Sequence, residues 1–192
     1  MAEPKINEKA KDVNLKANSN KEFFLIHGYT GSPTDFSNLG EYLHKKFNAN
    51  VKILRLRGHG TNIDDLDDLE FEDFANQIEK ELKKDIKKGR IIVLGGVSFG
   101  AQLALYLAGK YHVNGIFHVS IPHNFKFPFN LPFFGFLGFF KKKWRKRISI
   151  KESELRSNGF SYKEMHAKGL GIVKVGRKEV EKGNIRTTMF NK

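Results

Sequence analysis

Ser98 occupies a sequence pattern that can perform nucleophilic chemistry. It is the centre of GVSFG at residues 96–100, which fits G-x-S-x-G. The pattern alone is a weak signal, but residues 90–95 have the composition of a buried strand and residues 100–109 that of a buried helix. A serine in the tight turn between such elements holds its hydroxyl exposed in a strained bend. The context therefore predicts a nucleophile, with an ordinary serine in a strand–helix turn as the alternative.

Two further motifs follow expected strands upstream of Ser98. HGYTGSP at residues 27–33 comes after the apolar run 22–27, and RGHG at residues 57–60 comes after the run 51–56. With GVSFG, these motifs resemble the α/β-hydrolase superfamily, specifically its carboxylesterase and monoacylglycerol-lipase-like branch. The resemblance covers about residues 22–120, and three motifs in the right order after successive strands make it specific.

The resemblance implies a role for each motif. It implies that Ser98 is the nucleophile and that the backbone N–H groups of Tyr29 and Phe99 form an oxyanion hole. Two fixed donors at that position stabilise the negative charge of a tetrahedral acyl intermediate. The resemblance also implies that His27 orients the loop after the first strand and that His59 is structural. It implies no metal and no organic cofactor.

The elements that must position these residues alternate along the chain. Strands are expected at 22–27, 51–56, 90–95 and 113–120. Helices are expected at 34–47, at 100–109, and around a buried stripe formed by Phe71, Phe74, Ile78, Leu82 and Ile86. Alternation of this kind predicts an α/β fold, a mostly parallel sheet with helices on both faces.

The sequence suggests four segments in one domain of 192 residues. Residues 1–21 are polar, lack the apolar region of a signal peptide and are expected to form a loose leader. Residues 22–121 are the α/β-hydrolase core, and residues 122–182 are expected to be a cap or lid insertion with a polar helix from about 149 to 168. Residues 183–192 resemble the start of a further core strand.

The catalytic acid and base of the resembling family are not matched. In that family an Asp or Glu and then a His follow the serine, but this chain has no aspartate after Asp85. We therefore expect a chain truncated before its acid and base, with C-terminal strands missing and an exposed sheet edge. The alternatives are one half of a split enzyme, or an improvised base such as His118 or His123.

Charge is distributed unevenly along the chain. Residues 1–109 hold 16 Lys and Arg against 16 Asp and Glu, whereas residues 110–192 hold 18 against 5. The uncharged aromatic run FPFNLPFFGFLGFF followed by KKKWRKR suggests peripheral membrane contact through residues 127–147; an ordinary cap with a basic face is the alternative. Nucleic-acid binding is not expected. The seven acids of residues 64–73 predict a solvated loop and a helix N-terminus rather than a cation site.

The expected function is hydrolysis of carboxylic esters through a Ser98 acyl-enzyme, with a small ester or an acyl lipid as substrate. The expected location is cytoplasmic or peripheral at the membrane, and the absence of cysteine fits a reducing compartment. One alternative is a non-catalytic remnant that binds lipid or membrane. Another is a peptide or thioester hydrolase on the same fold.

Overall fold

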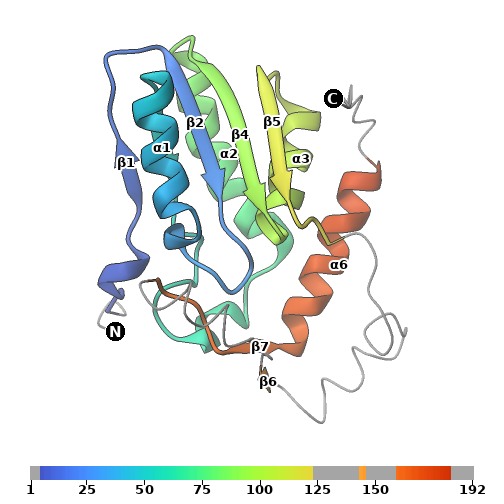
Figure 1. Ribbon diagram of the computed structural model, residues 1–192. Coiled ribbons are helices and arrows are strands. Elements are labelled where there is room, and N and C mark those ends of the chain that lie inside the picture. The colour runs from blue at the N-terminus through green and yellow to red at the C-terminus, as the bar shows by residue number, and fades with distance from the viewer. Residues whose placement is uncertain (1–4, 123–142, 146–158, 183–192) are drawn as a thin grey trace.

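A central sheet carries the elements on which Ser98 depends (Figure 1). The computed structural model describes residues 5–122, 143–145 and 159–182. In it, five strands lie in the order β1-β3-β2-β4-β5; β2 to β5 are parallel, and β1 runs antiparallel to β3. The strands are β1 (Val13–Leu15), β2 (Lys21–Ile26), β3 (Asn50–Ile53), β4 (Ile91–Val97) and β5 (Gly115–Val119).

Helices cover both faces of this sheet, as Figure 1 shows. Neighbouring residues of β2 point to opposite faces: Phe24 belongs to the core cluster that includes residues of α2, α3 and α6, and Leu25 belongs to the cluster that includes Leu43 of α1. The α/β-hydrolase-type fold expected from the alternating pattern is confirmed. The α-helices are α1 (Ser37–Phe47), α2 (Phe71–Lys87), α3 (Phe99–Lys110) and α6 (Ala167–Lys182). The remaining elements are η1 (Glu8–Ala10), η2 (Pro33–Phe36), η3 (Ile63–Leu66) and the antiparallel pair β6 (Lys143–Arg145) and β7 (Glu164–His166).

Local chemistry in the sequence sets the ends of α2. The Glu70 backbone N–H donates to the Asp73 carboxylate at 2.9 Å, which gives the helix a capping box. Gly89, with φ of 66°, takes the left-handed conformation just past the end of the helix. The acids of residues 64–73 thus include helix caps, as expected, and the predicted stripe from Phe71 to Leu82 is buried.

The N-terminal segment differs from the expected loose leader. From residue 5 onward it packs on the sheet: Val13 to Leu15 pair with Ile53 to Val51, and Ala10 is fully buried. Within the described residues, β3 would otherwise be an edge strand with open backbone groups. A three-residue strand of mixed polarity covers that edge. It is too short to give a periodic signal in the sequence.

The C-terminal part of the described chain also differs from expectation. The polar helix expected at about 149–168 is wrong for its described part: residues 159–163 are irregular, β7 follows, and the helix starts only at Ala167. Residues 149–158 lie outside the described residues, as do residues 183–192. A Cβ at Gly169 would lie 2.2 Å from the Tyr29 ring, so glycine lets α6 approach the core closely. In the described part of the chain, no helix is both long and apolar enough to cross a membrane.

Candidate active site

Ser98 lies in a strained turn between β4 and α3. Its backbone has φ of 54° and ψ of −119°, a conformation that L-residues rarely adopt. The Ser98 N–H donates to the Val119 carbonyl at 2.9 Å, so β5 anchors the turn. The side chain is half-buried, and α3 begins at the next residue. This is the strand–turn–helix geometry predicted for a nucleophilic serine.

The two glycines of GVSFG allow backbone segments to approach one another closely. A Cβ on Gly96 would lie 2.3 Å from the Gly100 carbonyl oxygen, and a Cβ on Gly100 would lie 2.0 Å from the Ile26 carbonyl oxygen. Any side chain at either position would overlap backbone atoms. The glycines therefore allow α3 to start against β2 and β4, as expected from the sequence.

A tight turn after β2 lies beside Ser98. In this Gly28 turn, residues 28–31, the Gly31 N–H donates to the Gly28 carbonyl at 3.0 Å. A Cβ at Gly28 would lie 3.6 Å from the Ser98 Cβ, so the two turns are in contact. Among the described residues, the N–H groups of Tyr29 and Phe99 donate to no acceptor. Both are therefore available to a ligand, and the Phe99 N–H is at a helix N-terminus.

His27 orients the peptide that carries the Tyr29 N–H. The buried His27 Nε2 accepts from the Leu56 N–H at 3.0 Å, so in a neutral ring the proton is on Nδ1, which lies 2.9 Å from the Gly28 carbonyl. Burial holds the pKa of His27 well below its usual range, which keeps the ring neutral. The Gly28 carbonyl and the Tyr29 N–H belong to one peptide plane, so fixing one fixes the other.

His59 holds the next carbonyl of the turn. Its Nε2 contacts the Tyr29 carbonyl, and its Nδ1 lies 3.0 Å from the Arg57 carbonyl. Burial lowers the pKa of His59, and its ring packs edge-on against that of His27 with centroids 4.9 Å apart. Both histidines are fully buried and engaged with the backbone. The structural roles implied by the resemblance therefore fit the geometry.

The Tyr29 side chain is buried in the core. Its ring packs edge-on against Phe74 and Phe99, and only 4% of the residue is exposed. Burial raises the pKa of the phenol far above its usual range. Only the backbone of Tyr29 is thus in a position to act beside Ser98.

The structure brings no histidine to the Ser98 hydroxyl among the described residues. His118 is exposed on β5, where it pairs in register with Gly96. No hydrogen bond joins His118 to Ser98. His123, the other improvised base considered, lies outside the described residues. The described chain therefore brings together a serine in a strained turn and two N–H groups that have no acceptor among the described residues.

Two contributors to the site had no recognisable signal in the sequence. The Asp35 carboxylate accepts from the Gly28 N–H at 3.5 Å, so it helps to close the Gly28 turn from η2. Residues 159–162, called the strap below, hydrogen-bond to the Thr30 carbonyl of the same turn from more than 120 positions away. A contact at such a separation has no local pattern, and only the folded chain reveals it.

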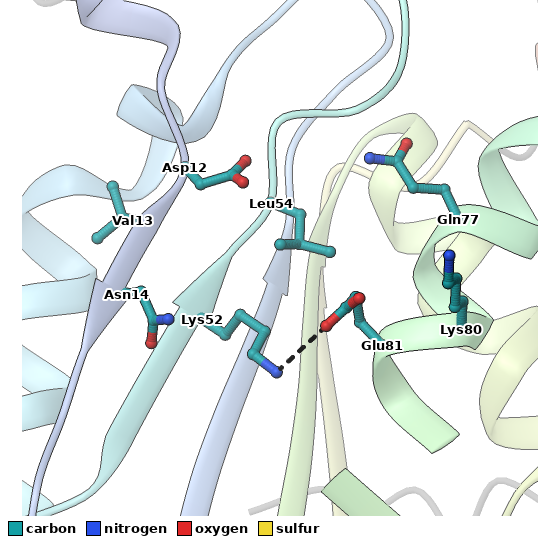
Figure 2. Close-up of a pocket in the computed structure, with 8 residues that line it drawn as sticks. All are labelled: Asp12, Val13, Asn14, Lys52, Leu54, Gln77, Lys80 and Glu81. Carbon is teal, nitrogen blue, oxygen red and sulfur yellow. Dashed lines mark ion pairs between the residues drawn. The ribbon is translucent and has the colours of Figure 1, made fainter. Parts of the chain in front are cut away.

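A separate polar cavity lies between the β1–β3 edge and α2 (Figure 2). Its volume is about 420 Å³. Lys52 lies at its floor, 4.0 Å from the Glu81 carboxylate and ion-paired with the buried Asp85. None of its lining residues belongs to the Gly28 turn or to the turn at Ser98, so this cavity is not where a Ser98 substrate would sit. The lining residues are Asp12, Val13, Asn14, Lys52, Leu54, Gln77, Lys80 and Glu81.

Comparison with known proteins agrees with this geometry. The model of the alpha/beta hydrolase family matches residues 23–171, and the chain belongs to that family.

Similar individual proteins include lipases. Over 84 residues the chain is 34% identical to the thermostable monoacylglycerol lipase of Bacillus sp. strain H-257; the match covers 44% of this chain and 33% of that enzyme. A solved structure from work on the metagenome-derived lipolytic enzymes LipS and LipT is similar with a TM-score of 0.76 at 18% identity, covering 93% of this chain and 72% of the other. The structure of the monoacylglycerol lipase of Paleococcus ferrophilus is similar with a TM-score of 0.68 at 13% identity, and the match covers 90% of this chain and 71% of the other. The chain thus spans only part of the length of these relatives.

Proposed function

We propose that Ser98 is the nucleophile of a carboxylic ester hydrolase and that the N–H groups of Tyr29 and Phe99 are its oxyanion hole. The observation that carries this proposal is the positive-φ turn at Ser98, in contact with a second turn, with both N–H groups lacking an acceptor among the described residues. Similarity to the Bacillus monoacylglycerol lipase supports an acyl lipid or a small ester as the substrate class.

The chemistry assigns one step to each group. The Ser98 oxygen attacks the ester carbonyl carbon while its proton passes to a general base, and the carbonyl oxygen becomes an oxyanion held by the two N–H groups. Collapse breaks the bond to the alcohol, which leaves with that proton, and water then releases the acid from Ser98. We place the general base outside the described residues, since no described histidine reaches the Ser98 hydroxyl.

We further propose that residues 122–182 include the cap over this site and that residues 127–147 contact membrane. The composition of the segment supports this, because an aromatic run precedes seven residues of which six are Lys or Arg. Co-sedimentation with phosphatidylcholine vesicles, with and without phosphatidylglycerol, tests the contact. Binding should rise with the anionic lipid, and binding insensitive to lipid charge contradicts it.

The nucleophile is tested in an extended chain, in which the C-terminal region of the Bacillus monoacylglycerol lipase is joined to Lys192. In the resembling family that region holds the acid and base. Ser98→Ala should lower kcat for p-nitrophenyl butyrate by about 10⁴ to 10⁶. Ser19→Ala, a matched change just before β2, should leave kcat unchanged. Full hydrolysis by the Ser98→Ala variant would contradict the proposal.

A further inference from the structure

We propose that the strap, residues 159–162, holds the Gly28 turn in place and that Tyr162 is its central positioning residue. This inference rests on the proposed function, because it assigns a catalytic consequence to the position of that turn. The strap comes just before β7 and contacts the segments that follow β2 and β3, although it is far from both along the chain. Two of its contacts are with the loop after β2, and the third is with the loop after β3.

The first contact is with the Gly28 turn itself. The Thr30 carbonyl accepts from the Tyr162 N–H and from the Ser161 hydroxyl, both at 2.9 Å. Three successive carbonyls of the turn are thus held by three different parts of the chain: Gly28 by His27, Tyr29 by His59, and Thr30 by the strap. The third anchor holds the Thr30–Gly31 peptide plane, which directly follows the two planes that the histidines hold.

The second contact is a closed ring of hydrogen bonds just after the turn. The Phe160 N–H donates to the Thr34 hydroxyl at 3.1 Å, and the Ser32 hydroxyl donates to the Phe160 carbonyl at 2.8 Å. Since the single Ser32 proton is committed there, the 2.7 Å contact between the two hydroxyls must use the Thr34 proton. Every donor in the ring has one acceptor, and such satisfied networks fix a single arrangement.

The third contact joins the strap to the loop that carries His59. The Tyr162 hydroxyl accepts from the Thr61 N–H at 3.2 Å and lies 2.9 Å from the Gly58 carbonyl and 3.1 Å from the Asn62 carbonyl. Its one proton serves one of these carbonyls, and burial raises the pKa of the phenol, which keeps that proton in place. Tyr162 therefore binds the Gly28 turn through its backbone and the loop behind that turn through its side chain.

The functional consequence concerns the Tyr29 N–H. An oxyanion donor acts only if it already points at the place where charge develops. The strap supplies part of that preorganisation from outside the β2, β3 and β4 loops. Displacing it should loosen the donor without unfolding the sheet.

The experiment is NMR-detected amide exchange on the chain itself. Ser161→Ala removes one bond to Thr30 and should speed exchange of the Gly31 amide about fivefold; Ser161→Thr keeps the hydroxyl and should restore the wild-type rate. Tyr162→Phe should speed the Thr61 and Gly31 amides. The matched control is Tyr111→Phe, which loses a hydroxyl bond to Glu79 on the far side of α3 and should leave both amides unchanged.

The inference is overturned if the Gly31 amide exchanges within twofold of wild type in Ser161→Ala and Tyr162→Phe while both keep the wild-type Tm. A lowered Tm together with an equal loss of protection at all amides would also overturn it. That result would mean that the substitution destabilises the whole fold rather than the Gly28 turn. This readout does not depend on Ser98 chemistry. Failure of the proposed function would instead be seen in the extended chain, as hydrolysis that survives Ser98→Ala.

Discussion

The two sides of Ser98 are built in different ways. On the side of β2, the Gly28 turn is held by two buried histidines, by Asp35 and by the strap. On the side of β5, Val119 is 51% exposed, His118 is exposed, and β5 has a hydrogen-bonded neighbour on one flank only within the described residues. The described residues therefore hold in place the turn whose N–H group we propose as an oxyanion donor, and none of their histidines is hydrogen-bonded to the Ser98 hydroxyl.

The largest effect on stability is expected on the β2 side of Ser98, where the backbones of α3 and β2 are in close contact. Gly100→Ala places a methyl group against the Ile26 carbonyl and should lower the free energy of unfolding by about 3 kcal/mol. The control is Gly171→Ala in α6, where nothing lies within 4 Å, which should raise it by up to about 1 kcal/mol. Urea unfolding measures both. Equal effects of the two substitutions would show that the close approach is not needed.

The two buried histidines on the β2 side of Ser98 should make the stability of the fold sensitive to acid. Their pKa values are lowered in the folded chain, so below about pH 6.5 the unfolded chain binds protons that the folded chain does not. The free energy of unfolding should therefore fall by roughly 2 kcal/mol between pH 7 and pH 5.5. Burial raises the pKa of Glu22, which acts in the opposite direction as the pH falls further.

Urea titrations at several pH values measure this dependence. The control is His112→Gln, which changes an exposed histidine and should leave the slope unaltered. A free energy of unfolding that stays constant from pH 7 to pH 5.5 would contradict the lowered pKa values of the two rings.

A smaller effect is expected from the Tyr29 side chain. Its hydroxyl is buried with no hydrogen-bond partner among the described residues. Tyr29→Phe should therefore raise the free energy of unfolding by about 1 kcal/mol, since an unsatisfied polar group is removed from the core. Thermal unfolding measures the change. Destabilisation by Tyr29→Phe would mean that the hydroxyl has a partner.

The smallest effect on stability is expected on the β5 side of Ser98. Val119→Thr on β5 should change the free energy of unfolding by no more than about 0.5 kcal/mol, because the side chain is already half in water. Val51→Thr in β3 is the matched change at a fully buried position and should cost about 2 kcal/mol. Similar costs at the two positions would show that β5 is covered in solution.

The parts of the site that come from continuous stretches of chain were predictable. The strained turn at Ser98, the buried stripe of α2 and the alternation of strands and helices each leave a local pattern in the sequence, and the structure has all three. β1 was missed because three residues of mixed polarity carry no period. The strap was missed because its hydrogen bonds join residues such as Thr30 and Tyr162, whose meeting depends on the whole fold.

The central claim is tested most directly by labelling Ser98 with a fluorophosphonate and locating the adduct by peptide mass spectrometry. The 192-residue chain and the extended chain are compared at equal concentration. The account predicts a label on Ser98 in the extended chain that forms about 10³ times faster than in the chain alone, because we propose that the base that takes the serine proton comes from the region that the extension supplies. Equal labelling rates in the two chains, abolished in the shorter one by His118→Ala or His123→Ala, would contradict it.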